Sequence, residues 1–244
     1  MAWRSVPAAH GWTWIAQAWT LFMRNPLVWV LIGVVFTVIY IGLHFLPVVG
    51  AMAALVLTPV FVGGMMVGCR ALEHGEPLTF DHLFAGFRDR PGSLLAVGAV
   101  YLGAAIVIAL IVGVATGGKL FEVLSGELDP AAIAAAAGTV MLALLIMLAL
   151  LVPVFMALWF APCLVLFQGR GALAAMGGSF VACLANTVPF LLYGLVLFLL
   201  SIPASMPAFL GWVVLGPVTA ASVYTAYRDI FGSGEKAPPA PQPG

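Results

Sequence analysis

Residues 27–46 form a run of about twenty amino acids without a formal charge, and similar runs recur along the chain. A helix that crosses the hydrocarbon core of a bilayer needs about 20 such residues. Of the 244 residues, 64% are hydrophobic and only 7% are charged, whereas a soluble domain has roughly 25% charged residues. The runs therefore predict a chain whose outer surface faces lipid.

Six such runs predict an all-α, polytopic integral membrane protein with six transmembrane helices. The expected spans lie at about 27–46, 48–69, 93–116, 131–167, 187–202 and 208–227. Pro26 and Pro91 come at the starts of the first and third spans, where a missing N–H has no cost. The fourth run is too long for one straight crossing, so we expect either that its Ala-rich start projects beyond the bilayer or that the helix tilts and bends, with Pro153 and Pro162 as the bends.

Three further segments have the spacing of amphipathic helices and are expected to lie in the membrane interface. Their apolar faces comprise Trp12, Ile15, Trp19 and Phe22; Phe80, Leu83, Phe84 and Phe87; and Leu173, Met176, Phe180 and Leu184. Arginines flank the first two. We therefore predict a lipid or partner interface formed by Trp12, Trp19, Phe22, Phe84 and Phe87 with Arg24, Arg88 and Arg90.

The order of these segments indicates a threefold internal repeat of an interfacial helix followed by a membrane hairpin. The second span of each hairpin contains a Pro-Val pair, and we predict helix breaks at Pro59, Pro153 and Pro217. The repeat units are placed at about 8–70, 78–168 and 171–229. Together they form one membrane domain over residues 1–230, and the Pro-rich residues 231–244 are expected to be a disordered tail.

The distribution of lysine and arginine predicts the orientation in the membrane. Eight of the nine fall on one side of a six-span arrangement: Arg4, Arg24, Arg70, Arg88, Arg90, Arg170, Arg228 and Lys236. Only Lys119 falls on the other side. Because positive residues stay in the cytoplasm, both termini are expected to be cytoplasmic.

Few residues suggest chemistry. The expected spans have no Asp, Glu, Lys or Arg at their centres, which argues against proton or sodium coupling. Glu73, His74, Glu76, Asp81 and His82 are the one cluster with metal-ligand residue types, but their spacing matches no established metal motif, and Arg70, Arg88 and Arg90 can neutralise the carboxylates. We expect no catalytic residue, metal, cofactor or nucleic-acid binding. Cys69, Cys163 and Cys183 are expected to be packed, reduced thiols.

The chain resembles an uncharacterised family of proteobacterial six-span inner-membrane proteins. The resemblance covers most of residues 7–230 and rests on GWTWIAQAWTLFMRNPLVWV and LTPVFVGGMMVGCRALEHGEPLTFDHLFAGF. It is most specific at Gly68-Cys69-Arg70, Gly75-Glu76-Pro77 and His82-Leu83-Phe84. The chain is also distantly similar to the membrane domain of some glycerophosphodiester phosphodiesterases; we expect no phosphodiesterase catalytic domain here and do not carry that activity over. The resemblance implies an inner-membrane location and leaves the activity open.

Three functions remain from the sequence. The first is a non-enzymatic inner-membrane accessory, assembly or lipid-interacting protein, whose partners are the bilayer and either a larger membrane complex or further copies of itself. The second is a transporter or permease-like protein for a small or lipidic molecule, which would need a cavity near the proline breaks. The third is a metal-dependent membrane enzyme using the loop with His74 and His82.

Overall fold

The computed structural model describes residues 3–119, 122, 137–206 and 210–232, and every regular element within them is a helix. The elements are α1 (His10–Arg24), α2 (Pro26–His44), α3 (Val49–Glu73), the 3-10 helix η1 (Phe80–Phe87), α4 (Pro91–Ala115), α7 (Ala137–Trp159), α8 (Ala161–Gln168), α9 (Ala172–Ala185), α10 (Thr187–Ser205) and α11 (Trp212–Phe231). The all-α prediction is therefore confirmed for the described residues.

Five stretches among the described residues are long and apolar enough to cross a membrane. They are α2, α3, α4, α10 and the pair α7 and α8, which together cover Ala137–Gln168. The predicted sixth span corresponds to α11, which does not meet these criteria. It contains several hydroxyl side chains, has Arg228 and Asp229 in its last turn, and is largely buried among other helices. The six-span prediction is thus supported for five helices.

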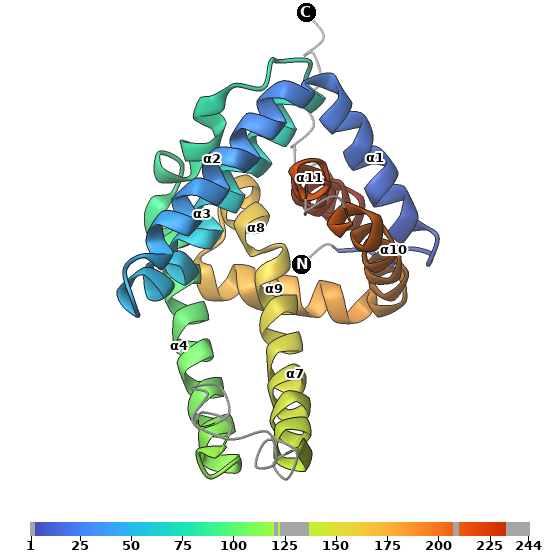
Figure 1. The fold of residues 1–244 in the computed structure, drawn as a ribbon. Helices are drawn as coiled ribbons and strands as arrows, with labels where there is room; N and C mark the ends of the chain where they lie inside the picture. The colour runs from blue at the N-terminus through green and yellow to red at the C-terminus, as the bar shows by residue number, and fades with distance from the viewer. Residues whose placement is uncertain (1–2, 120–121, 123–136, 207–209, 233–244) are drawn as a thin grey trace, which may run out of the picture.

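The helices form three pairs. Figure 1 shows α4 and α7 extending together away from the rest of the molecule, while α2 lies along α3 and α10 lies beside α11. The three short helices pack against the second member of a pair. η1 packs on α3, α9 packs on α7 and α8, and α1 packs on α11. Each short helix therefore contacts the pair that precedes it in the chain, with α1 completing the cycle on the last pair.

The long helix predicted over 131–167 is interrupted at Phe160, where α7 ends and α8 begins. The hydroxyl of Ser179 in α9 bridges the gap. It donates to the carbonyl of Met156 at 2.6 Å and accepts from the backbone N–H of Phe160 at 2.9 Å. These two groups would bond to each other in an uninterrupted helix. Pro162 lies in the first turn of α8, where a proline fits.

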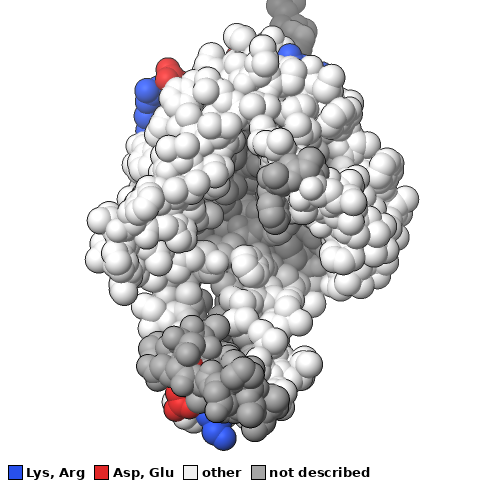
Figure 2. Space-filling model, in the orientation of Figure 1, with Lys and Arg blue, Asp and Glu red and all other residues white. Residues whose placement is uncertain are grey.

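The main core lies where the short helices meet the pairs, and it includes the fully buried side chains of Trp14, Trp29, Leu83, Phe160 and Tyr227. Leu94 and Val97 of α4 belong to this core, whereas farther along α4 and α7 the described residues form a small separate cluster of Ile108, Val112 and Ala143. Outward-facing leucines and valines along the spans are largely exposed. Figure 2 shows charged side chains at two ends of the visible face, with a broad uncharged surface between them. Such a surface is suited to contact with lipid.

Several predictions lie outside the described residues. They are the start of the fourth span at 131–136, the first residues of the sixth span at 208–209, and most of the tail, 233–244. α11 continues to Phe231, four residues beyond the predicted end of the sixth span.

Candidate lipid interface

The predicted apolar face of α1 is divided between the protein core and the surface. Ile15 and Phe22 are buried, whereas Trp12 is 56% exposed and Trp19 is 47% exposed. The buried face also includes Trp14, Ala18 and Leu21, so the side of α1 that packs against the protein is rotated relative to the predicted face. Two large indoles are therefore left on the outer surface, where tryptophan is favoured at a membrane interface.

A hydrogen-bond network around Asp229 explains this rotation. The indole N–H of Trp14 donates to Asp229 at 2.8 Å, and His10 Nδ1 lies 2.6 Å from the same carboxylate oxygen. Arg4 donates to the other oxygen at 2.5 Å. Burial raises the pKa of Asp229, but these hydrogen bonds outweigh it, so the net pKa is lowered. The hydrogen bonds of Asp229 join α1 to α11 and hold the side chain of Trp14 in the core.

The second predicted amphipathic helix is the 3-10 helix η1. Thr79 and His82 cap its start reciprocally, since the Thr79 N–H donates to His82 Nδ1 at 3.0 Å. Leu83 is buried, and Phe84 is half-buried with its ring against those of Phe61, Phe80 and Phe87. Phe87 is 40% exposed. Of the two phenylalanines predicted for the interface, Phe87 is more available to lipid and Phe84 is mainly a packing residue.

The third predicted amphipathic helix is α9, and its predicted face is also divided. Met176 is buried, whereas Leu173 is 72% exposed and Leu184 is 58% exposed. The residues packed inward are small, including Ala175, Gly178, Ser179 and Ala182. α9 therefore lies close to α7 and α8 and leaves two leucines on its outer side.

The arginines gather at helix ends that contact one another. Arg24, the last residue of α1, donates to the carbonyl of Leu72 near the end of α3. Arg90 precedes α4 and donates through Nη1 to the carbonyl of Gly169, which ends α8, at 3.0 Å. Cations are favourable at helix C-termini because the last carbonyls lack partners. We call the region of Arg24, Arg70, Arg88, Arg90, Arg170 and Arg228 the basic end.

A cavity of about 430 Å³ opens at the basic end, and we call it the arginine pocket. Its lining consists of Val67, Arg70, Arg88, Asp89, Arg90, Leu166 and Phe167. The residues come from the end of α3, the link between η1 and α4, and the end of α8. The guanidinium carbon of Arg70 lies 4.6 Å from the centre of the Phe167 ring, a cation–π contact that fixes the arginine against an apolar wall. Of the three arginines predicted for the interface, Arg88 and Arg90 thus share a site with Arg70, and Arg24 lies outside it.

Glu73, in the cluster that has metal-ligand residue types, has a different partner from the arginines expected to neutralise it. Glu73 pairs with Arg228 of α11, and it also accepts from the hydroxyl of Tyr224 at 2.5 Å. Arg228 donates further to Gln17 of α1 at 3.1 Å. The neutralising arginine is therefore Arg228, and Glu73 joins three helices. Within the described ranges, no group of three His, Cys, Asp or Glu side chains is placed to hold a metal ion.

The predicted breaks at Pro59, Pro153 and Pro217 lie inside α3, α7 and α11, and each helix continues past its proline. Pro59 and Pro217 are buried, and Pro217 contacts the position of Gly33 in α2. The interruption in the fourth span is instead at Phe160. All three cysteines are free and buried. Burial raises the pKa of the Cys183 thiol to about 12, and a hydrogen bond with Ser179 opposes this shift.

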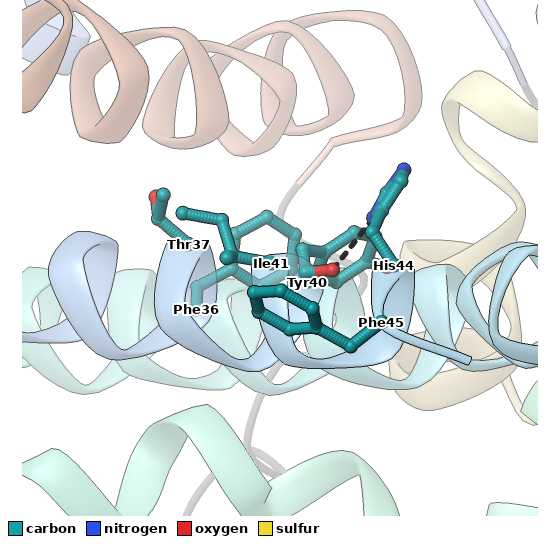
Figure 3. Close-up of a pocket in the computed structure, with 6 residues that line it drawn as sticks. All are labelled: Phe36, Thr37, Tyr40, Ile41, His44 and Phe45. Atoms are coloured by element: carbon teal, nitrogen blue, oxygen red, sulfur yellow. Dashed lines mark hydrogen bonds between the residues drawn. The ribbon is translucent and has the colours of Figure 1, made fainter. Parts of the chain in front are cut away.

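A second cavity, of about 450 Å³, lies along the far half of α2. Its wall is formed by Phe36, Thr37, Tyr40, Ile41, His44 and Phe45 (Figure 3). The polar atoms of this wall bond within the helix pair. His44 Nδ1 lies 2.7 Å from the Tyr40 carbonyl, as the dashed line shows, and the Tyr40 hydroxyl lies 2.5 Å from Thr58 Oγ1. Figure 2 also shows a hollow in the middle of the visible face.

Comparison with curated proteins finds a relative over nearly the whole chain. The chain is 29% identical over 262 aligned residues to a protein of Burkholderia thailandensis named "Probable inner membrane protein", covering 96% of this chain and 95% of the relative. No family model matches the chain, and no solved structure matches it. The chain is a multi-pass membrane protein. The relative's name supports an inner-membrane location, and the likeness to the phosphodiesterase membrane domain is not shown by these comparisons.

Proposed function

We propose that this protein is a non-enzymatic inner-membrane protein that engages anionic lipid, or a partner protein in the membrane, through its basic end and the neighbouring short helices. The observation that supports this most is the combination of exposed aromatic side chains and arginines on segments that connect the spans. Trp12, Trp19 and Phe87 remain on the surface, although other residues of the same helices are buried in the main core. Aromatic rings and arginines together are typical of the membrane interface.

The contacts at the basic end support a cytoplasmic location for this end. Arg24 reaches Leu72, Arg228 reaches Glu73 and Arg90 reaches Gly169, so the ends of α1, α3, α8 and α11 and the start of α4 lie together. Lys119 follows the opposite end of α4. We infer six crossings with both termini in the cytoplasm, because this arrangement puts the arginines on one side.

The cyclic packing of the short helices supports the threefold repeat. η1, α9 and α1 each pack on the second helix of the preceding pair. A triplicated unit would produce this order, because each new copy would meet the exposed side of the copy before it. We infer that the three units close into a ring, with α1 joining the first unit to the last.

Replacing both exposed tryptophans tests the proposed function. Trp12→Ser with Trp19→Ser should reduce co-purification of lipid or partner while the protein still inserts, since neither indole is in the core. Val114→Ser is the matched control, because Val114 is 82% exposed and lies at the opposite end of α4. Equal retention of lipid and partner by the tryptophan variant and the control would contradict the proposal.

The alternative function is a transporter or permease-like protein for a small or lipidic molecule. The cavity along α2 and the hollow in Figure 2 favour it. A water-filled path would make Thr37→Cys and Ile41→Cys reactive toward a membrane-impermeant maleimide, whereas Leu110→Cys, on the exposed side of α4, would stay unlabelled. Absence of labelling at both cavity positions would exclude an aqueous path through this cavity.

A further inference from the structure

The arginine pocket has an excess of positive charge that the protein itself does not neutralise. Arg70, Arg88 and Arg90 face one carboxylate, that of Asp89. Two other arginines are paired with carboxylates: Arg4 binds Asp229, and Arg228 binds Glu73. Within the described ranges, none of the three pocket arginines forms an ion pair with a carboxylate. This pocket is therefore electrostatically incomplete.

The three arginines are held in different ways. Arg70 lies over the ring of Phe167, and Arg90 is fixed by its bond to the Gly169 carbonyl. Arg88 is exposed and has no hydrogen bond to another described side chain, so its guanidinium is available for a ligand. Arg170 follows Gly169 directly but does not line the pocket, and its guanidinium lies against Gly178 of α9. One of its guanidinium nitrogens is buried without a hydrogen-bond partner among the described residues.

The remaining walls favour a ligand that is both anionic and partly apolar. Val67, Leu166 and Phe167 form the apolar side of the pocket. The lining residues belong to the ends of α3 and α8 and to the link that precedes α4, so they lie at the ends of candidate spans. Phospholipid headgroups lie at this level of a bilayer.

We propose that the arginine pocket binds a phosphate group, supplied by the headgroup of an anionic phospholipid. Arginine forks match phosphate oxygens in charge and geometry, and the apolar wall would lie against the glycerol and the first acyl carbons. This inference rests on the proposed function, because it names the lipid chemistry that the basic end recognises. The pocket differs from the surface formed by Trp12 and Trp19, so the two can be tested separately.

Native mass spectrometry of the full chain in detergent, titrated with phosphatidylglycerol, tests the pocket. Arg88→Gln should weaken lipid binding about fivefold, since a basic residue near a membrane surface contributes about that factor. Asp89→Asn should strengthen binding by a comparable factor, because it removes the pocket's carboxylate. Arg4→Gln is the matched control, since it loses the same charge outside the pocket and should leave binding unchanged.

A second titration with inorganic phosphate identifies the source of the ligand. Arginine-dependent binding of phosphatidylglycerol alone supports a headgroup site, and arginine-dependent binding of inorganic phosphate supports the phosphate site with a soluble ligand. Equal binding by wild type, Arg88→Gln and Arg4→Gln in both titrations overturns the proposal. Circular dichroism of each variant establishes that it is folded, which is expected because Arg88 and Asp89 are exposed.

The outcomes separate this inference from the proposed function. If the Trp12→Ser, Trp19→Ser variant loses its lipid or partner while Arg88→Gln keeps the wild-type affinity for phosphatidylglycerol, the phosphate site is overturned. The proposed function then still stands. If Arg88→Gln weakens lipid binding and the Trp12→Ser, Trp19→Ser variant binds like wild type, the pocket is supported and the proposed role of α1 is overturned.

Discussion

The contact between α3 and η1 depends on glycines, and it supports a quantitative prediction. A Cβ atom at Gly64 would overlap the backbone carbonyls of His82 and Leu83, and one at Gly86 would overlap the carbonyl of Val60. The obstructing atoms are backbone, so no side-chain rotation can relieve the overlap. Gly64→Ala must therefore push η1 away from α3.

The expected loss of stability follows from this geometry. Overpacking in a tight interface costs about 1–3 kcal/mol, while replacing a helical glycine by alanine contributes up to about 1 kcal/mol in the opposite direction. Gly103→Ala is the matched control, because Gly103 is an exposed residue of α4 with no atom within 4 Å of an added Cβ. The difference between the two variants isolates the steric cost of about 1–3 kcal/mol.

Thermal unfolding in detergent measures this difference. For a chain of this size each kcal/mol shifts Tm by about 2–4 °C, so Gly64→Ala should unfold roughly 2–12 °C below Gly103→Ala. Because η1 also positions Arg88 and Arg90, we expect Gly64→Ala to weaken phosphatidylglycerol binding. Identical Tm values for the two variants would refute the close packing of η1 on α3.

Three further predictions concern charge, thiols and orientation. Asp229→Asn should destabilise the protein at neutral pH by about 1–3 kcal/mol. Because the pKa of Asp229 is lowered in the folded protein, acid-unfolding curves should show the difference from wild type disappearing as the pH falls below about 4. A difference that does not depend on pH would contradict this. Cys183 should resist maleimide at pH 8 until the protein is denatured, because its pKa is raised to about 12; rapid labelling of the folded protein would show an open site. Lys119→Cys should be labelled from the periplasmic side of intact cells, and labelling only after lysis would reverse the orientation.

Local sequence signals located most of the helices. Pro26 and Pro91 begin α2 and α4 as their positions indicated, and the uncharged runs marked the five candidate spans. These features depend on residues that are close together in the sequence and on whether a stretch is apolar enough to lie in lipid, and both can be read from the sequence. The break at Phe160 could not be located, because the Ser179 hydroxyl that satisfies it comes from another helix.

The candidate site was predicted in parts. Spacing identified the exposed indoles of Trp12 and Trp19, but the inward turn of Trp14 depends on Asp229, about two hundred residues away. Arg88 and Arg90 were singled out from their position before a span, whereas their convergence with Arg70 and Phe167 requires α8 to pack beside α3. Glu73 was grouped with neighbouring histidines, yet its partner is Arg228. In each case a long-range contact decided the role.

Native mass spectrometry after gentle extraction from the original membrane tests the central claim most directly. We predict that the protein retains anionic phospholipid or a defined membrane protein, and that the Trp12→Ser, Trp19→Ser variant loses it. If neither wild type nor the variant carries lipid or a partner protein, a function based on engaging lipid or a partner at the basic end is contradicted.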